Sequence, residues 1–154
     1  KAEIAKVRLM SDIDEKEMIS FALSLENRTH HPFRGTIARR AKELGAAEKE
    51  VQFHEYFPGR GIIGVVDGKE VALGSAKLLE TLSISFDEKA AGIDPGKTVL
   101  YFAMSGRVAG ALEIEDAIKD SAGATIKELE NAGIRVMIAS GDKEGIVAGT
   151  ARAL

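Results

Sequence analysis

The chain begins with strand-like alternation of apolar and polar positions and then changes to helical spacing. Residues 2–10 alternate, which predicts a short strand. Apolar residues then recur every three or four positions from Met18 to Leu25, which predicts a helix that Ser11 or Asp12 can cap. Residues 33–44 form a second predicted helix, because a proline directly before it suits a first helical turn.

Strand patterns dominate the middle of the chain. Asp67-Gly68 is a strong hairpin signal between two of the strands, and Ser105-Gly106 joins two others. A short helix is expected at 76–81 and a surface loop at 83–97. About five strands with hairpin connections predict a mainly antiparallel sheet flanked by helices, an α+β domain spanning residues 1–114. These strands are 50–56, 61–66, 69–73, 98–104 and 107–114.

The pattern changes near Glu115-Asp116, and residues 115–154 predict a second unit. A helix is expected at 121–131, followed by an apolar run at 134–139 of the kind found in buried parallel strands. Another helix follows to the end. This helix–strand–helix order predicts a partial α/β segment, and since one strand cannot form a sheet, we expect its domain to continue outside these residues.

Composition restricts the classes of function. The chain has 154 residues, a net charge of −3 and no cysteine. These values argue against a general nucleic-acid binder and exclude disulfides, thiol catalysis and thiolate metal sites. No apolar run approaches the roughly 18–20 residues that cross a bilayer. Because the sequence begins with Lys1 instead of Met, we expect a piece of a longer protein.

The region from Glu26 to Ser75 carries the strongest candidate chemistry. His31 stands at a predicted helix start, where an imidazole can stack on a base or donate to a phosphate, or simply pack or face water. Glu26 belongs by default to a solvated helix face, but a carboxylate in a pocket could accept a hydrogen bond from an exocyclic amine. Gly59 and Gly61 match a G-x-G-x-x-G pattern, yet a strand follows them instead of the helix that dinucleotide binding requires.

Two explanations therefore remain for the glycine pair. It forms either an ordinary bend in a hairpin or a place where a flat ring or a phosphate approaches the backbone. Gly74-Ser75 is a strand exit with a helix cap, or part of the same pocket. Ser140, Gly141 and Asp142 follow the apolar run at 134–139, as a capped helix start or as a loop facing phosphate and Mg²⁺. The three histidines show no metal-ligand spacing.

In this order and spacing, the motifs resemble the ATP-binding region of heavy-metal-transporting P-type ATPases, the copper and zinc/cadmium pumps. Glu26 with His31-Pro32, Gly59-Arg60-Gly61 and the strand ending in Gly74-Ser75 match that family's motifs. Asp116 to Lys119 resembles its hinge motif, and 137–143 resembles its Thr-Gly-Asp-Asn loop. Ala117 replaces the hinge proline, and Ser140 and Lys143 replace Thr and Asn.

The resemblance implies that an adenine nucleotide binds at one pocket lined by the six residues Glu26, His31, Gly59, Gly61, Gly74 and Ser75. It implies ATP with Mg²⁺, and as partners the rest of the phosphorylation domain, an actuator domain and a transmembrane domain of the same chain. The fragment would be a cytoplasmic portion of an integral membrane protein, with copper ahead of zinc or cadmium as cargo.

The sequence contains no Asp-Lys-Thr-Gly-Thr motif with the aspartate that the family phosphorylates, so we expect no turnover by these residues alone. Two other functions stay open at this point. One is a regulatory nucleotide-binding module without transport, and the other is part of a haloacid-dehalogenase-type phosphatase.

Overall fold

The computed structural model describes residues 2–94, 96–116, 118, 121–141 and 144–154. Its elements, in chain order, are β1 (Ala2–Leu9), α1 (Glu15–Glu26), α2 (Arg34–Leu44), β2 (Val51–Phe57), β3 (Gly61–Val66), β4 (Lys69–Gly74), α3 (Ala76–Thr81), β5 (Thr98–Met104), β6 (Arg107–Asp116), α4 (Ala122–Asn131) and α5 (Glu144–Ala153).

Six antiparallel strands form one sheet in the order β1-β6-β5-β4-β3-β2. The predicted hairpin turns are present: Asp67 and Gly68 have φ angles of 48° and 71°, and Ser105 and Gly106 have 51° and 77°. Two successive residues with positive φ form a tight turn whose twist matches that of the flanking strands. The predicted α+β class with a mainly antiparallel sheet is confirmed, and pairing of β1 with β6 adds the sixth strand.

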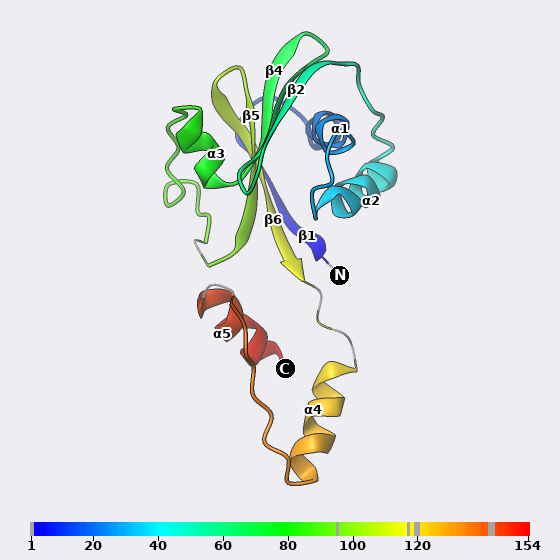
Figure 1. Cartoon of the computed structure of the whole chain (residues 1–154), viewed down its shortest axis with the longest axis vertical. Helices are drawn as coiled ribbons and strands as arrows, with labels where there is room; N and C mark the ends of the chain where they lie inside the picture. The colour runs from blue at the N-terminus through cyan, green and yellow to red at the C-terminus, as the bar shows by residue number, and fades with distance from the viewer. Residues whose placement is uncertain (1, 95, 117, 119–120, 142–143) are drawn as a thin grey trace.

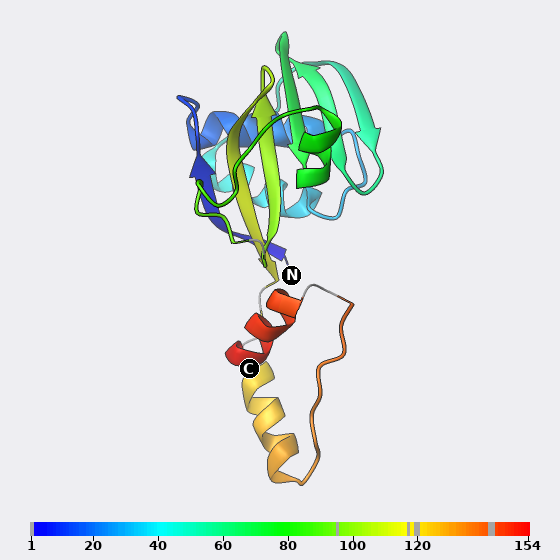
Figure 2. The ribbon, with the colours of Figure 1, turned by 90° about the vertical axis from the view of Figure 1, so that its left-hand side faces the viewer.

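The sheet separates two apolar layers. Figure 1 shows α1 and α2 against one face and α3 against the other, and Figure 2 shows α3 and the segment after it crossing in front of the strands. The larger core lies under α1 and α2 and includes Phe21, Leu25, Ile62 and Phe102. The smaller core, under α3, includes Leu78 and Tyr101 among its buried residues.

Helix α1 begins later than the sequence predicts. Asp14 is its cap, since its carboxylate accepts a hydrogen bond of 2.7 Å from the backbone N–H of Glu17. Ser11 and Asp12 were expected in this role, but the Ser11 hydroxyl instead accepts from Ile13 N–H, within the turn that precedes the helix. Asp14 is therefore the residue directly before the first helical residue of α1.

The segment 83–97 contains no helix or strand among its described residues, as expected, and Arg8 holds it to the sheet. The Arg8 guanidinium lies 2.6 Å from the buried carboxylate of Glu113 and donates to the carbonyl oxygens of Ala91 and Gly92. Arg8, with Lys97 3.8 Å from the same carboxylate, thus compensates Glu113 on β6, and Arg8 also fixes an irregular loop over it.

The predicted parallel strand at 134–139 is wrong. These residues are neither helix nor strand, and Ile134, Met137 and Ile138 are 51%, 80% and 44% exposed. A strand needs a neighbour for its backbone hydrogen bonds, and no described strand lies beside this run. The flanking helices α4 and α5 form close to the expected bounds, and Figures 1 and 2 show both beyond the end of β6.

Within the described residues, no helix combines the length and the apolar character needed to span a bilayer.

Candidate functional site

Glu26 and His31 form a buried pair at the junction of α1 and α2. Glu26 is the last residue of α1, and its side chain is only 2% exposed. The default expectation of a solvated position is therefore wrong for this residue. The His31 imidazole is 17% exposed, and its Nδ1 lies 3.3 Å from Oε1 of Glu26. A turn closed by Thr29, which bonds back to Glu26, brings the two side chains together.

The orientation of His31 is fixed by its neighbours. Its backbone N–H donates to the Thr29 hydroxyl at 3.2 Å, and its ring packs edge-on against Phe33 with centroids 5.2 Å apart. His30, by contrast, is exposed. Phe33 was not among the candidate residues, although its position two residues after His31 could have indicated it.

The buried pair leaves polar atoms without hydrogen bonds. Oε2 of Glu26 and Nδ1 of His31 are buried and have no hydrogen-bond partner within the part of the chain that the structure describes. The 3.3 Å contact between the residues is close enough for an ion pair but lacks the geometry of a hydrogen bond. Such atoms carry a desolvation penalty of about 1–3 kcal/mol each, so this junction is suited to a polar ligand.

The glycines form a second group, at the end of the β3–β4 hairpin opposite its turn. Gly61 pairs directly with Gly74 across the two strands. Ser75 donates twice to the carbonyl oxygen of Arg60, from its backbone N–H at 2.8 Å and from its hydroxyl at 3.1 Å. The structure therefore brings Gly59, Gly61, Gly74 and Ser75 together. Because the Ser75 hydroxyl is used here, it makes no side-chain capping bond to α3.

Gly59 and Gly61 have different roles. Gly61 has a φ of +145°, and a methyl group added there would lie 2.3 Å from the Leu73 carbonyl oxygen and 2.6 Å from Gly74 Cα. Its missing side chain thus permits close approach of two strands of the protein itself. Gly59 has a φ of +70° and no atom within 4 Å of an added methyl group, so open space adjoins it. Of the two, Gly59 is the glycine beside which a ligand has room.

Helix α1, which carries Glu26, packs against β3, the strand that begins at Gly61. Leu25, the residue before Glu26, reaches Gly64 on β3, where an added methyl group would meet its Cδ2 at 2.7 Å. Leu25 and Ile62 share the core beneath α1 and α2. Leu25, the residue before Glu26, therefore packs on the same face of β3 as Ile62, the residue after Gly61.

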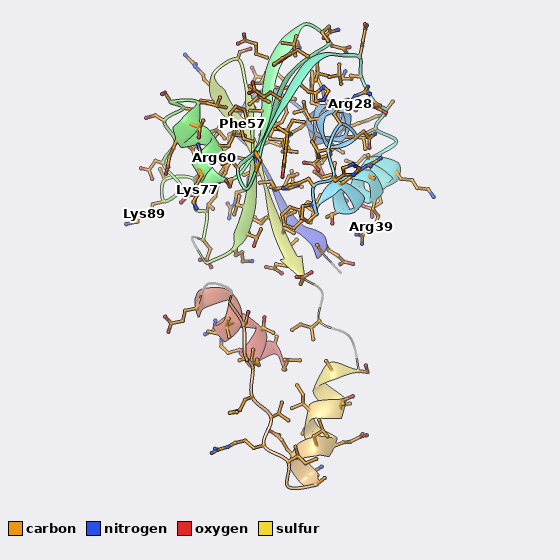
Figure 3. The ribbon with its side chains drawn as sticks, viewed as in Figure 1. Arg28, Arg39, Phe57, Arg60, Lys77 and Lys89 are labelled. Carbon is orange, nitrogen blue, oxygen red and sulfur yellow. The ribbon has the colours of Figure 1, made fainter. Side chains whose placement is uncertain are left out.

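Cations lie near the glycine group. The Arg60 guanidinium donates to the Thr81 hydroxyl at 2.7 Å, and Figure 3 shows Arg60 and Lys77 on the side of the sheet where α3 lies. Both side chains belong to exposed residues. Positive charge is thus available beside Gly59 and Ser75 without a Walker-type lysine loop.

The structure does not join the phosphate-loop candidates to these groups. Ser140 and Gly141 are exposed in the segment between α4 and α5, and Asp142 lies outside the described residues. Two hollows of about 430 Å³ and 350 Å³ lie on the α3 face of the sheet, and neither is lined by any of the six pocket residues. The described residues contain no group of three or more His, Cys, Asp or Glu side chains that could hold a metal ion.

Comparisons with known proteins identify the family. A profile described as a haloacid dehalogenase-like hydrolase matches residues 4–154. A copper-transporting P-type ATPase of Rhizobium leguminosarum is 32% identical over the whole chain, and a copper-exporting P-type ATPase of Legionella pneumophila is 34% identical over 86% of it. A putative cadmium/zinc-transporting ATPase of Arabidopsis thaliana is 30% identical over 88% of the chain and is matched over 12% of its own length.

Solved structures agree with this relationship. A zinc-transporting PIB-type ATPase matches 99% of the chain with a TM-score of 0.76 at 23% identity, over 25% of its own chain. The catalytic domain of the CPx-ATPase CopB-B, described in connection with nucleotide binding, has a TM-score of 0.72 at 21% identity, over 99% of this chain and 53% of its own. The N-domain of a copper-transporting P-type ATPase is 25% identical with a TM-score of 0.59, over 75% of this chain and 98% of its own.

The chain spans about a fifth of the length of the copper ATPases it matches, 19% in both cases. Its six-stranded antiparallel sheet with flanking helices is the architecture of the N-domain structure that it covers almost completely. The chain therefore belongs to the haloacid dehalogenase-like hydrolases, among their heavy-metal P-type ATPases, and corresponds to the nucleotide-binding part of the catalytic region.

Proposed function

We propose that this chain binds ATP through Glu26, His31 and the glycine group, as part of a heavy-metal-transporting P-type ATPase. The observation that carries the proposal is the buried pair whose Glu26 Oε2 and His31 Nδ1 lack hydrogen bonds within the described residues. Buried polar atoms without hydrogen bonds are rare in folded proteins, and a bound ligand is one explanation for them. The family relationship supplies the class of ligand, because the related CopB-B domain is described as undergoing conformational changes on nucleotide binding.

The chemistry of the pair suits an adenine base. The exocyclic amine of adenine donates hydrogen bonds. An ionised carboxylate such as that of Glu26, which is buried here, can only accept them. Guanine presents a carbonyl oxygen at the corresponding ring position, which the ionised Glu26 carboxylate would repel. The site therefore favours ATP and ADP over GTP.

The phosphates of the nucleotide would extend toward Gly59, Arg60 and Ser75. Gly59 adjoins open space, and Arg60 carries a guanidinium suited to phosphate oxygens. In the intact pump, the γ-phosphate would pass to an aspartate outside this chain, and positioning with charge neutralisation would supply most of the catalysis. Mg²⁺ would arrive with the nucleotide, since this ion is usually held in large part by the phosphates of its substrate.

The remaining assignments concern the parent protein. The chain would be the cytoplasmic ATP-binding portion of an integral membrane pump, from residues 1–114, with 115–154 forming part of the phosphorylation domain. Exposed apolar side chains at Ile134, Met137 and Ile138 are suited to burial against the rest of that domain. Copper is the proposed cargo because copper ATPases of two bacteria align with most or all of the chain, although a cadmium/zinc ATPase aligns at 30% identity.

A titration of the chain with ATP, ADP and GTP, followed by amide NMR shifts and calorimetry, tests the proposal. We expect ATP and ADP to shift the amides of Glu26, His31 and Gly59 to Gly61, and GTP to bind more weakly. A well-dispersed spectrum that stays unchanged at millimolar ATP would refute the proposal. A test of the cargo requires the parent protein. We expect its ATPase activity to be stimulated by Cu⁺ but not by Zn²⁺ or Cd²⁺.

The family description also allows a phosphatase, since the matching profile is that of a haloacid dehalogenase-like hydrolase. Such an enzyme would hydrolyse small phosphomonoesters and has no need of a buried pair like Glu26 and His31. If the parent protein cleaves p-nitrophenyl phosphate at the same rate with His31→Gln as with the natural residue, the phosphatase is favoured. Loss of ATP affinity in that variant favours the nucleotide site.

A further inference from the structure

The edge strand β2 presents two large exposed aromatic side chains on opposite faces of the sheet. Phe53 is 50% exposed and pairs with Val65 on β3, and Tyr56 is 44% exposed and pairs with Ile62. Residues directly opposite each other on antiparallel strands share a face. Each aromatic ring therefore lies on the same face of the sheet as the β3 residue opposite it.

Tyr56 lies on the face that carries α1. Its partner Ile62 is buried in the core beneath α1 and α2, and Gly64 on the same face meets the Leu25 side chain. Phe53 and Phe57 belong to the other face. Phe53 lines the hollow of about 350 Å³ there, and Phe57, labelled in Figure 3, packs on the α3 core. The register is regular from Phe53 to Phe57, so this alternation is not interrupted.

Tyr56 also lies near the glycine group in the strand register. Across the strands it stands opposite Ile62, which follows Gly61 directly. Its diagonal neighbour on β3 is Gly64, at a distance of about 8 Å. Leu25 rests on Gly64, which pairs with His54, so Tyr56 and His54 share one face of the sheet with the end of α1 that carries the buried pair.

We propose that Tyr56 is the surface on which the base of the nucleotide stacks, an inference that rests on the proposed function. A half-exposed aromatic ring on an uncovered edge strand offers a π-face to a planar ring, while Glu26 and His31 offer polar atoms to the edge of that ring. Stacking recognises any base, and the buried pair then selects adenine. The inference assigns base affinity to β2, an element that contributes none of the six pocket residues.

Two tyrosines and no tryptophan make the test direct. Tyr101 is buried and bonded to Glu88, so quenching of tyrosine emission by added ATP would arise at Tyr56. We expect ATP and AMP to quench this emission, and tripolyphosphate, which has no base, to leave it unchanged. The Tyr101→Phe variant, with Tyr56 as its single tyrosine, should show the same quenching.

Affinities measured by calorimetry give the second readout. Tyr56→Ala should weaken ATP and AMP binding by the same factor, roughly five- to hundredfold, while Tyr56→Phe keeps wild-type affinity. Tyr56→Leu, which keeps apolar bulk on the edge strand, should lose affinity like Ala while retaining the thermal midpoint. Phe53→Ala is the matched control, because it removes an equally exposed aromatic ring from the opposite face of the same strand.

The outcomes separate the two proposals. If the natural chain binds ATP and Tyr56→Ala binds it equally well, the inference fails and the nucleotide site stands. An equal loss of affinity in Phe53→Ala and Tyr56→Ala also overturns the inference, because the effect would then belong to the strand. If the folded natural chain binds no ATP, the proposed function fails and the stacking role with it.

Discussion

Replacement of Gly61 by alanine should destabilise the fold strongly, and two other glycines give the scale. An added methyl group at Gly61 would lie 2.3 Å from a backbone oxygen and 2.6 Å from a backbone carbon of β4, in a residue with φ of +145°. Backbone strain of this kind is worth about 1–3 kcal/mol. Overpacking against atoms that cannot rotate away adds about 1–3 kcal/mol more. We expect the free energy of unfolding to fall by about 4 kcal/mol.

The controls separate strain from collision. Gly59→Ala has positive φ but open space, so it should lose only about 1–2 kcal/mol. Gly35→Ala, in α2 with no atom within 4 Å, should be neutral or gain up to about 1 kcal/mol. Urea unfolding followed by circular dichroism measures all three variants. A Gly61→Ala variant as stable as Gly59→Ala would refute the close approach of β3 and β4.

The expected instability of Gly61→Ala bears on the function of Gly59 and Gly61. The sequence suggests that a side chain at Gly61 would fill a ligand pocket, and Gly61→Val would then weaken binding in a folded protein. The structure instead predicts that loss of nucleotide binding at Gly61 accompanies unfolding. Gly59, which adjoins open space, is the glycine at which a side chain would obstruct a ligand and leave the fold intact.

Three further predictions concern individual side chains. His31→Gln should weaken ATP binding about tenfold by calorimetry with an unchanged thermal midpoint, and unchanged affinity would remove His31 from the site. Glu26→Gln should raise the free energy of unfolding by about 1 kcal/mol, because it neutralises a buried carboxylate, while weakening ATP binding; lower stability would contradict this. Burial and then the hydrogen bond to Glu88 raise the pKa of Tyr101 well above that of an ordinary phenol. Unfolded tyrosine ionises near pH 10, so stability should fall above that pH, and Tyr101→Phe should reduce the fall measured by urea unfolding.

Local signals were sufficient for much of the sheet. Alternating patterns and turn residues such as Asp67-Gly68 place β3 and β4 within a residue of their observed ends, because a two-residue turn fixes the register of both strands. Gly45 ends α2 in the left-handed conformation that its lack of a side chain allows. These features depend on neighbours in sequence, which a sequence displays directly.

Features that depend on residues distant in the sequence could not be predicted in this way. The pairing of β1 with β6 joins the start of the chain to residue 116, and no local pattern specifies it. The collision that makes Gly61 necessary involves a strand that returns thirteen residues later. The apolar run at 134–139 shows the converse, because its composition is typical of a buried strand but no described strand pairs with it.

The glycine group and the buried pair of Glu26 and His31 differ in the physical reason for their residues. At Gly61 and Gly74 the fold alone is sufficient, since both positions exclude a methyl group through contacts with the protein's own backbone. At Glu26 and His31 the fold gives no reason, since burial of a carboxylate with an unbonded oxygen opposes folding. A ligand that donates to this carboxylate would supply the missing stabilisation. For this reason the stability of Glu26→Gln, compared with its affinity for ATP, discriminates function from structure more sharply than any substitution at the glycines.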